Sequence, residues 1–216
     1  MNAVHLLRPL LTPAAQGELS ARFDRASVRD ILEDTFLDYE SQRANLPREA
    51  SAGARVMVHL AALTIGLYRA LLSRGISEDE ARSLTARITS KIYSKMAAAP
   101  TALSRLGTRS TRSRVKRATD LFRCFPFSQQ SYDMVDVDEG NDVVAFDVRR
   151  CPVAEYFRGH DLGDVCVESW CNLDFGLAER WGARLERRQT IAGGATHCDF
   201  RWHIAHPPEP DEEDLT

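Results

Sequence analysis

The sequence predicts an α+β fold, with a helical N-terminal half and an antiparallel four-stranded sheet with helices packed on one face. The first observation is a change of hydrophobic period, from helical spacing in the first half of the chain to alternation in the second. The second is a pair of turns, Gly140-Asn141 and Gly193-Gly194, that each separate two β-rich segments. The four expected strands cover residues 132–137, 143–148, 184–191 and 196–204.

The helical part of the chain is expected at residues 25–125. Its most apolar segment, Ala52–Ser73, is apolar nearly all round, which is typical of a helix at the centre of a core. His59 and Arg69 interrupt this apolar run, whereas a membrane-spanning helix needs about 20 mostly apolar residues. We therefore expect a core helix and no membrane partner.

The sheet and the cysteine motifs are expected at residues 126–206, with a helix from Asp164 to Trp181 between the two strand pairs. Residues 25–206 should form a single α+β domain, because 216 residues that are 44% hydrophobic suffice for one sizeable core. Residues 1–24 are expected to be an N-terminal extension. Residues 207–216, which are Pro-rich and acidic, are expected to be a disordered tail.

Charge narrows the class of partner. The formal net charge of −3 argues against a generic binder of polyanions. A basic segment, Leu103–Arg123, holds seven Lys or Arg residues against the single acid Asp120, but no aromatic residue interleaves with them before Phe122. We interpret it as a solvated face and expect a small-molecule substrate and no nucleic acid, while a homo-oligomer is possible.

The five cysteines bear on location and chemistry. The N-terminus lacks a basic region and a small-residue cleavage site, so a cytoplasmic location is expected. Thiols stay reduced there, and the cysteines should be core residues, metal ligands or nucleophiles. Four of them fall between Cys151 and Cys198, so this segment is where chemistry is expected.

A zinc site is the first possibility for these cysteines. Cys166 and Cys171 lie five positions apart in the expected helix, which puts them about 140° apart around an α-helix axis. Two thiols so placed could not easily grip one ion. Zinc held by Cys151 or Cys198 together with one of them stays possible, although no metal ligand is assigned.

Nucleophilic catalysis is the second possibility. Cys171 and Asp174 are three positions apart and share a helix face. A carboxylate raises the pKa of a neighbouring thiol, so Asp174 is better suited to acid–base work or to orienting a substrate. Cys166 is expected near the helix N-terminus, where the helix dipole favours a thiolate. Any one of these cysteines taken alone is more simply a small buried hydrophobe.

The last expected strand carries two distinct faces. Alternation puts Cys198, Phe200 and Trp202 on one face. The other face holds His197, Asp199, Arg201 and His203. If the polar row faces the helix, Arg201 shares a pocket with Cys171 and Asp174. If the aromatic row does, Cys198 faces Cys171, Arg201 points to solvent, and the polar row is a face of cross-strand ion pairs.

At these residues the chain resembles the L-2-amino-thiazoline-4-carboxylic acid hydrolase family, over roughly residues 25 to 203. The matching elements are Arg-Cys-Pro-Val-Ala-Glu-Tyr-Phe at 150–157, Cys166 with Trp-Cys-Asn-Leu-Asp at 170–174, Thr-Ile-Ala-Gly at 190–193 with Cys-Asp-Phe-Arg at 198–201, and helical residues 61–96. The resemblance implies hydrolytic opening of a cyclic amidine or isothiourea. Water adds at the carbon between ring sulfur and nitrogen, the C–S bond breaks, and N-carbamoyl-L-cysteine results.

Residue chemistry then suggests roles for such a hydrolase. The nucleophile would be Cys171, or a water held by Asp174. An acid would protonate the leaving group, and a cation would hold the substrate carboxylate. The candidate acids are His197 and Asp199, the candidate cations are Arg201 and Arg150, further substrate contacts are Trp170 and Glu155, and the other candidate thiols are Cys151, Cys166 and Cys198.

An alternative of another class is a non-catalytic binding module. The C-terminal half is distantly similar to the 4-vinyl reductase domain, a small-molecule-binding module. The resemblance implies a zinc-binding cysteine eight residues before the position of Cys198, where this chain has Thr190. Metal analysis separates the two readings, since the binding module should carry about one zinc per chain and the hydrolase none.

Overall fold

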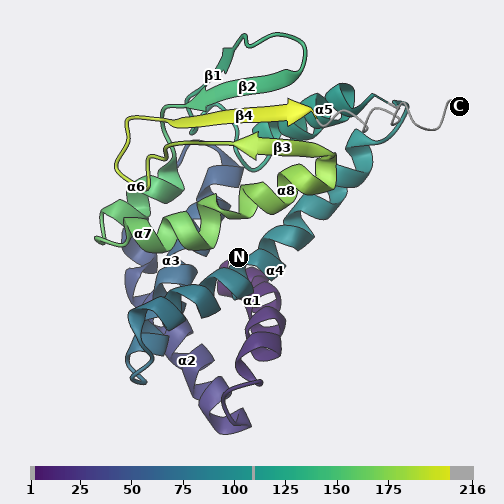
Figure 1. Ribbon diagram of the computed structural model, residues 1–216. Coiled ribbons are helices and arrows are strands. Elements are labelled where there is room, and N and C mark those ends of the chain that lie inside the picture. Colours follow the sequence, from purple (N-terminus) through teal and green to yellow (C-terminus); the bar gives the residue numbers. More distant parts are fainter. Residues whose placement is uncertain (1–2, 109, 205–216) are drawn as a thin grey trace, which may run out of the picture.

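The computed structural model describes residues 3–108 and 110–204, and the expected tail 207–216 lies outside them. Helices make up the first half of this part, and a sheet with further helices makes up the second (Figure 1). The helices of the first half are α1 (Ala3–Leu19), α2 (Arg25–Gln42), α3 (Ala52–Leu72), α4 (Glu78–Ser104) and α5 (Thr111–Cys124), with a 3₁₀ turn at Arg43–Asn45.

Helix α3 is the centre of the helical half. It packs against α2, α4 and α6 (Pro152–Arg158). By length and composition it could cross a membrane, but 72% of its most apolar window is buried within the fold, as in the core helix that the sequence predicts. The side chain of Ser51 caps its start by accepting a hydrogen bond from the backbone N–H of Ala54.

Helix α1 is an element that the sequence analysis does not predict. It lies within residues 1–24 and packs on α4 and α2. Leu7, Leu11 and Leu19 are buried on its inner side. Proline is unfavourable inside a helix, so Pro9 and Pro13 argue against a helix here when only the local sequence pattern is considered.

The sheet is antiparallel throughout, with strand order β1-β2-β4-β3, as the sequence predicts for its class. The strands are β1 (Met134–Val137), β2 (Val143–Val148), β3 (Ala183–Glu186) and β4 (Cys198–Ile204). Strand β3 is shorter than expected. The carboxylate of Asp199 accepts hydrogen bonds from the backbone N–H groups of Arg188 and Gln189. These N–H groups therefore do not pair with the backbone of β4, and the strand ends before them.

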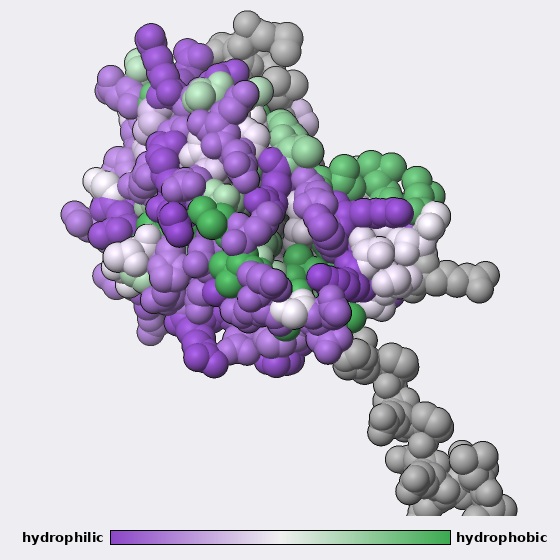
Figure 2. Space-filling model, turned by 90° about the horizontal axis from the view of Figure 1, so that it is seen from above, coloured by the Kyte–Doolittle hydropathy of each residue, from purple (hydrophilic) through white to green (hydrophobic). Residues whose placement is uncertain are grey.

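Helices cover one face of the sheet. Helices α5 and α8 (Leu173–Trp181) pack against it, and α1, α2 and α3 lie further from it, in the lower part of Figure 1. The other face carries polar side chains such as Asp147, Asp199 and Arg201, and Figure 2 shows that the surface seen from above is mostly hydrophilic. The α+β class with helices on one face is therefore confirmed.

The helix expected from Asp164 to Trp181 is divided in three. Helix α7 (Gly163–Cys166) is followed by a π-helical turn, Val167–Cys171, and then by α8. Gly182 ends α8 in the left-handed conformation, at φ 77°. The Asp164 side chain does not cap this segment and instead forms an ion pair with Arg82.

Candidate functional site

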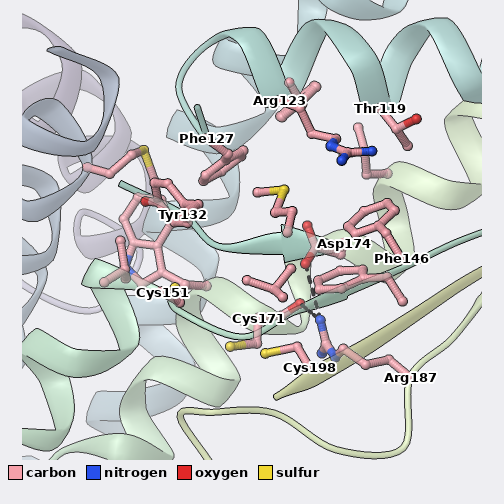
Figure 3. Close-up of a pocket in the computed structure, with 18 of the residues that line it drawn as sticks. Thr119, Arg123, Phe127, Tyr132, Phe146, Cys151, Cys171, Asp174, Arg187 and Cys198 are labelled. Atoms are coloured by element: carbon pink, nitrogen blue, oxygen red, sulfur yellow. Dashed lines mark hydrogen bonds and ion pairs between the residues drawn. The ribbon is translucent and has the colours of Figure 1, made fainter. Parts of the chain in front are cut away.

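A cavity of about 120 Å³ lies between the inner face of the sheet and the helices beneath it. Most of its walls are aromatic or aliphatic. The polar part of its walls is formed by Arg123, Asp174, Arg187, Thr119 and four cysteines. Figure 3 shows Arg123 reaching toward the cavity from α5, opposite Cys171, Cys198 and Arg187.

The four cysteines on this wall are Cys151, Cys166, Cys171 and Cys198, all of the cysteines in the segment that the sequence singles out. The expectation that Cys166 and Cys171 point about 140° apart is wrong. The turn between them is π-helical, and a π-turn contains more residues than an α-turn, so five positions bring the two side chains back to one face. Their thiols are close enough to interact, and this contact shifts the pKa of both.

The contact between the two thiols makes Cys171 the more acidic of the pair. The pKa of Cys171 is lowered, first by the Cys166 thiol and then by the Arg187 guanidinium, against burial and the Asp174 charge. The same contact and burial raise the pKa of Cys166 well above its usual value. Of the two thiols, Cys166 therefore keeps its proton more firmly and Cys171 has more thiolate character.

Asp174 and Arg187 form a buried ion pair beside these thiols. Arg187 Nη1 lies 3.1 Å from Asp174 Oδ2, and the side chains are 3% and 16% exposed. Tyr93 donates its hydroxyl to Asp174 Oδ1 at 2.7 Å. Burial raises the pKa of Asp174, while Arg187 and Tyr93 oppose that rise. Both carboxylate oxygens therefore have a partner and the side chain is fixed in place.

Arg187 is one of the cavity residues that the sequence analysis misses. It follows β3, and its Nη1 also donates to the carbonyl oxygen of Cys171 at 2.9 Å, which ties the strand to the π-turn. The signal that could have found it is alternation. Ala183 and Leu185 are buried on one face of β3, and Arg187 continues that row, so a cation is expected on an apolar face.

Three of the predicted site residues, His197, Asp199 and Arg201, face away from the cavity. Cys198, Phe200 and Trp202 line it, so the polar row of β4 lies on the outer face of the sheet. The expectation that Arg201 shares the Cys171 pocket is therefore wrong, because the aromatic row supplies the apolar contacts with α8. Arg201 pairs with Glu139 and Asp147. His197 bonds Gln189, and Asp199 accepts the two backbone N–H groups after β3.

The remaining candidates divide between surface and cavity. Arg150 lies outside the cavity lining and is bound by Glu49 and by Glu155, at 2.8 and 2.9 Å, so neither Arg150 nor Glu155 is placed to meet a ligand there. Trp170 is buried on the cavity wall, where its indole N–H donates to Thr64 at 3.2 Å.

Cys151 and Cys198 are the less reactive thiols of the cavity. Burial raises the pKa of Cys198 to about 12 and that of Cys151 further. The sulfur of Cys198 accepts a hydrogen bond from the backbone N–H of Ile191 at 3.2 Å, and that of Cys151 accepts one from Ala154 at 3.5 Å. In the described part of the chain, no group of three or more His, Cys, Asp or Glu side chains is arranged to hold a metal ion.

These pKa directions predict selective alkylation. A thiol with a lowered pKa holds more thiolate at a given pH, and thiolate is the form that reacts. In a Cys124→Ser background, which removes an exposed cysteine, iodoacetamide at pH 7 should label Cys171 before Cys151 and Cys198. The rate should rise with pH and level off below the ordinary thiol pKa of about 8.5. Peptide mass mapping measures it, and equal labelling of the three would contradict the assignment.

The fold and the site define an α+β protein with a thiol-lined internal cavity of small-molecule size. Residues 55–202 match the model of the L-2-amino-thiazoline-4-carboxylic acid hydrolase family, and the chain belongs to that family, which is named as a family of hydrolases. Among curated proteins, no significant match is found. Among solved structures, the Fe(II) unliganded H-NOX protein from K. algicida is similar at a TM-score of 0.44 and 8% identity, covering 94% of this chain and 98% of that one.

Proposed function

We propose that this protein is a hydrolase that opens a small cyclic amidine or isothiourea, such as 2-amino-thiazoline-4-carboxylate, with Cys171 as the nucleophile. The observation that carries the proposal is the position of Cys171, which lines an aromatic cavity beside Cys166 and the buried Arg187–Asp174 ion pair. The lowered pKa of Cys171 and the hydrolase activity for which the family is named point to the same chemistry.

The size and walls of the cavity suit a flat five-membered ring. Its volume of about 120 Å³ is close to the roughly 150 Å³ of an engineered apolar cavity that binds benzene. Phe146 and Phe200 stack at 5.1 Å on the sheet side, and Trp170 closes another wall. Planar walls of this kind favour a planar ligand over a flexible chain.

The proposed reaction has two steps at one carbon. The Cys171 thiolate adds to the amidinium carbon between ring nitrogen and ring sulfur, the ring C–S bond breaks, and Cys166 gives its proton to the leaving sulfur. Water then adds to the same carbon and returns one proton to Cys166. The bond to Cys171 breaks, the new hydroxyl loses its proton to solvent, and an N-carbamoyl product leaves with Cys171 again a thiolate.

The alternative of a water activated by Asp174 is less favoured by the geometry. Both oxygens of Asp174 already accept hydrogen bonds, from Tyr93 and from Arg187. A carboxylate held in this way is suited to fixing Arg187 and to offsetting the charge of an amidinium ring. Arg187 in turn contributes to the lowered pKa of Cys171.

The test is incubation of the purified protein with L-2-amino-thiazoline-4-carboxylate. N-carbamoyl-L-cysteine should accumulate, and intact mass spectrometry of rapidly quenched samples should show one substrate-derived adduct on Cys171. Failure to turn over this compound and related cyclic amidines would contradict the proposed function. If product forms without an adduct, and a Cys171 variant keeps full activity, the mechanism must be attack by a water molecule activated by Asp174.

The position of Arg201 gives a sharp negative prediction. Because its guanidinium pairs with Glu139 and Asp147 on the outer face of the sheet, Arg201→Ala should change kcat/KM by less than about twofold. Any loss of stability should be small, as expected for partly exposed ion pairs. A tenfold or larger fall in kcat/KM at an unchanged melting temperature would place Arg201 in the site after all.

A further inference from the structure

The charged side chains described on the cavity wall differ in how buried their ion-pair partners are. Asp174 and Arg187 bind each other inside the fold, at 16% and 3% exposure. Arg123 has an ion pair with Asp136, whose side chain is 75% exposed. A salt bridge to such an exposed carboxylate contributes little, so another anion can readily take the place of Asp136.

Arg123 is nevertheless held at the cavity. It lies in the last turn of α5, its side chain is only 17% exposed, and its guanidinium lies 5.4 Å from the centre of the Phe146 ring. Figure 3 shows it opposite Cys171 and Arg187. A ligand that reacts at Cys171 would therefore extend its other end toward Arg123.

The unpaired polar groups on the same wall are hydrogen-bond donors. Within the described residues, the buried indole N–H of Trp202 and the buried hydroxyl of Tyr132 have no hydrogen-bond partner. By contrast, the indole N–H groups of Trp170 and Trp181 each bond a threonine hydroxyl. Because a buried unpaired donor is costly, the cavity favours a ligand that supplies acceptor oxygens.

We infer that Arg123 binds the acid group of the substrate, with Asp136 as its counter-ion in the empty site. This inference rests on the proposed function and narrows it, from cyclic amidines in general to ring compounds that carry a carboxylate. Arg123 takes the role that the sequence analysis gave to Arg201 or Arg150. The Trp202 and Tyr132 donors favour the same kind of ligand.

The experiment compares two substrates that differ in the acid group. The parent protein should have a kcat/KM for L-2-amino-thiazoline-4-carboxylate about 10- to 100-fold above that for 2-amino-2-thiazoline, which lacks the carboxylate. Arg123→Met should remove most of this preference, mainly through KM. The matched control is Lys116→Met, on the same helix and paired with an acid but outside the cavity lining, and it should keep the preference. Asp136→Asn should bind the acid at least as well as the parent.

A binding measurement separates this inference from the proposed function. L-thiazolidine-4-carboxylate is titrated against tryptophan fluorescence, since three tryptophans line the cavity. The parent should bind it about 10-fold or more tightly than Arg123→Met does. If it does so without turning over either thiazoline, the acid subsite stands and the proposed function fails. The subsite is overturned if Arg123→Met binds L-thiazolidine-4-carboxylate as tightly as the parent does. It is also overturned if Arg123→Met still turns over the carboxylate substrate in preference to 2-amino-2-thiazoline. In both cases the proposed function is untouched.

Discussion

A Cys171→Ser variant should lose at least about 1,000-fold in kcat while it folds normally. A serine hydroxyl is not ionised at neutral pH. The variant therefore lacks the nucleophilic thiol whose pKa Cys166 and Arg187 lower. The hydrogen bond from Arg187 to residue 171 involves its backbone carbonyl and survives the change. The melting temperature should therefore stay within a few degrees of the parent value. Steady-state kinetics with calorimetry measures both quantities.

Two neighbouring cysteines provide the controls for this result. Cys198→Ser changes a thiol in the same cavity whose pKa is raised, and it should keep kcat within about threefold of the parent. Cys166→Ala should lower kcat by an intermediate factor of about 10 to 100, because Cys171 loses the neighbouring thiol that lowers its pKa. Equal losses in all three variants would indicate a packing effect and would exclude a special role for Cys171.

An Arg187→Met variant should be the most destabilised of the single changes considered. It leaves the Asp174 carboxylate buried without its cation, and breaking a buried ion pair in this way costs about 3–5 kcal/mol of the free energy of unfolding. In a chain of this length, that corresponds to a fall in melting temperature of about 10 °C. Cation–π contacts with Phe175 and Phe200 are lost as well.

The matched control is the next residue in the chain. Arg188 is also an arginine paired with a carboxylate, but its side chain is 82% exposed, so Arg188→Met should change stability by less than about 0.5 kcal/mol. Adding Asp174→Asn to Arg187→Met removes the uncompensated charge and should recover part of the lost stability. If the double variant is no more stable than Arg187→Met, the buried charge of Asp174 is not the cause of the loss.

The sequence by itself determined the α+β class, the approximate places of the four strands and the cysteine segment, but not that β3 ends at Glu186. Alternation and glycine turns set strands at nearly the positions observed, because these signals are local. The apolar composition of Ala52–Leu72 was likewise sufficient to predict a core helix. Family motifs around Cys171 and Asp174 identified two side chains that line the cavity.

Only the tertiary structure decided how these residues meet. The π-turn between Cys166 and Cys171 packs against α4, and no residue pattern distinguishes it from an α-helical turn. Which face of β4 meets the helices was open in the sequence, because both rows were chemically plausible. Burial of the aromatic row settled it, and this sent Arg201 outward while Arg187 on the neighbouring strand came to lie beside Asp174.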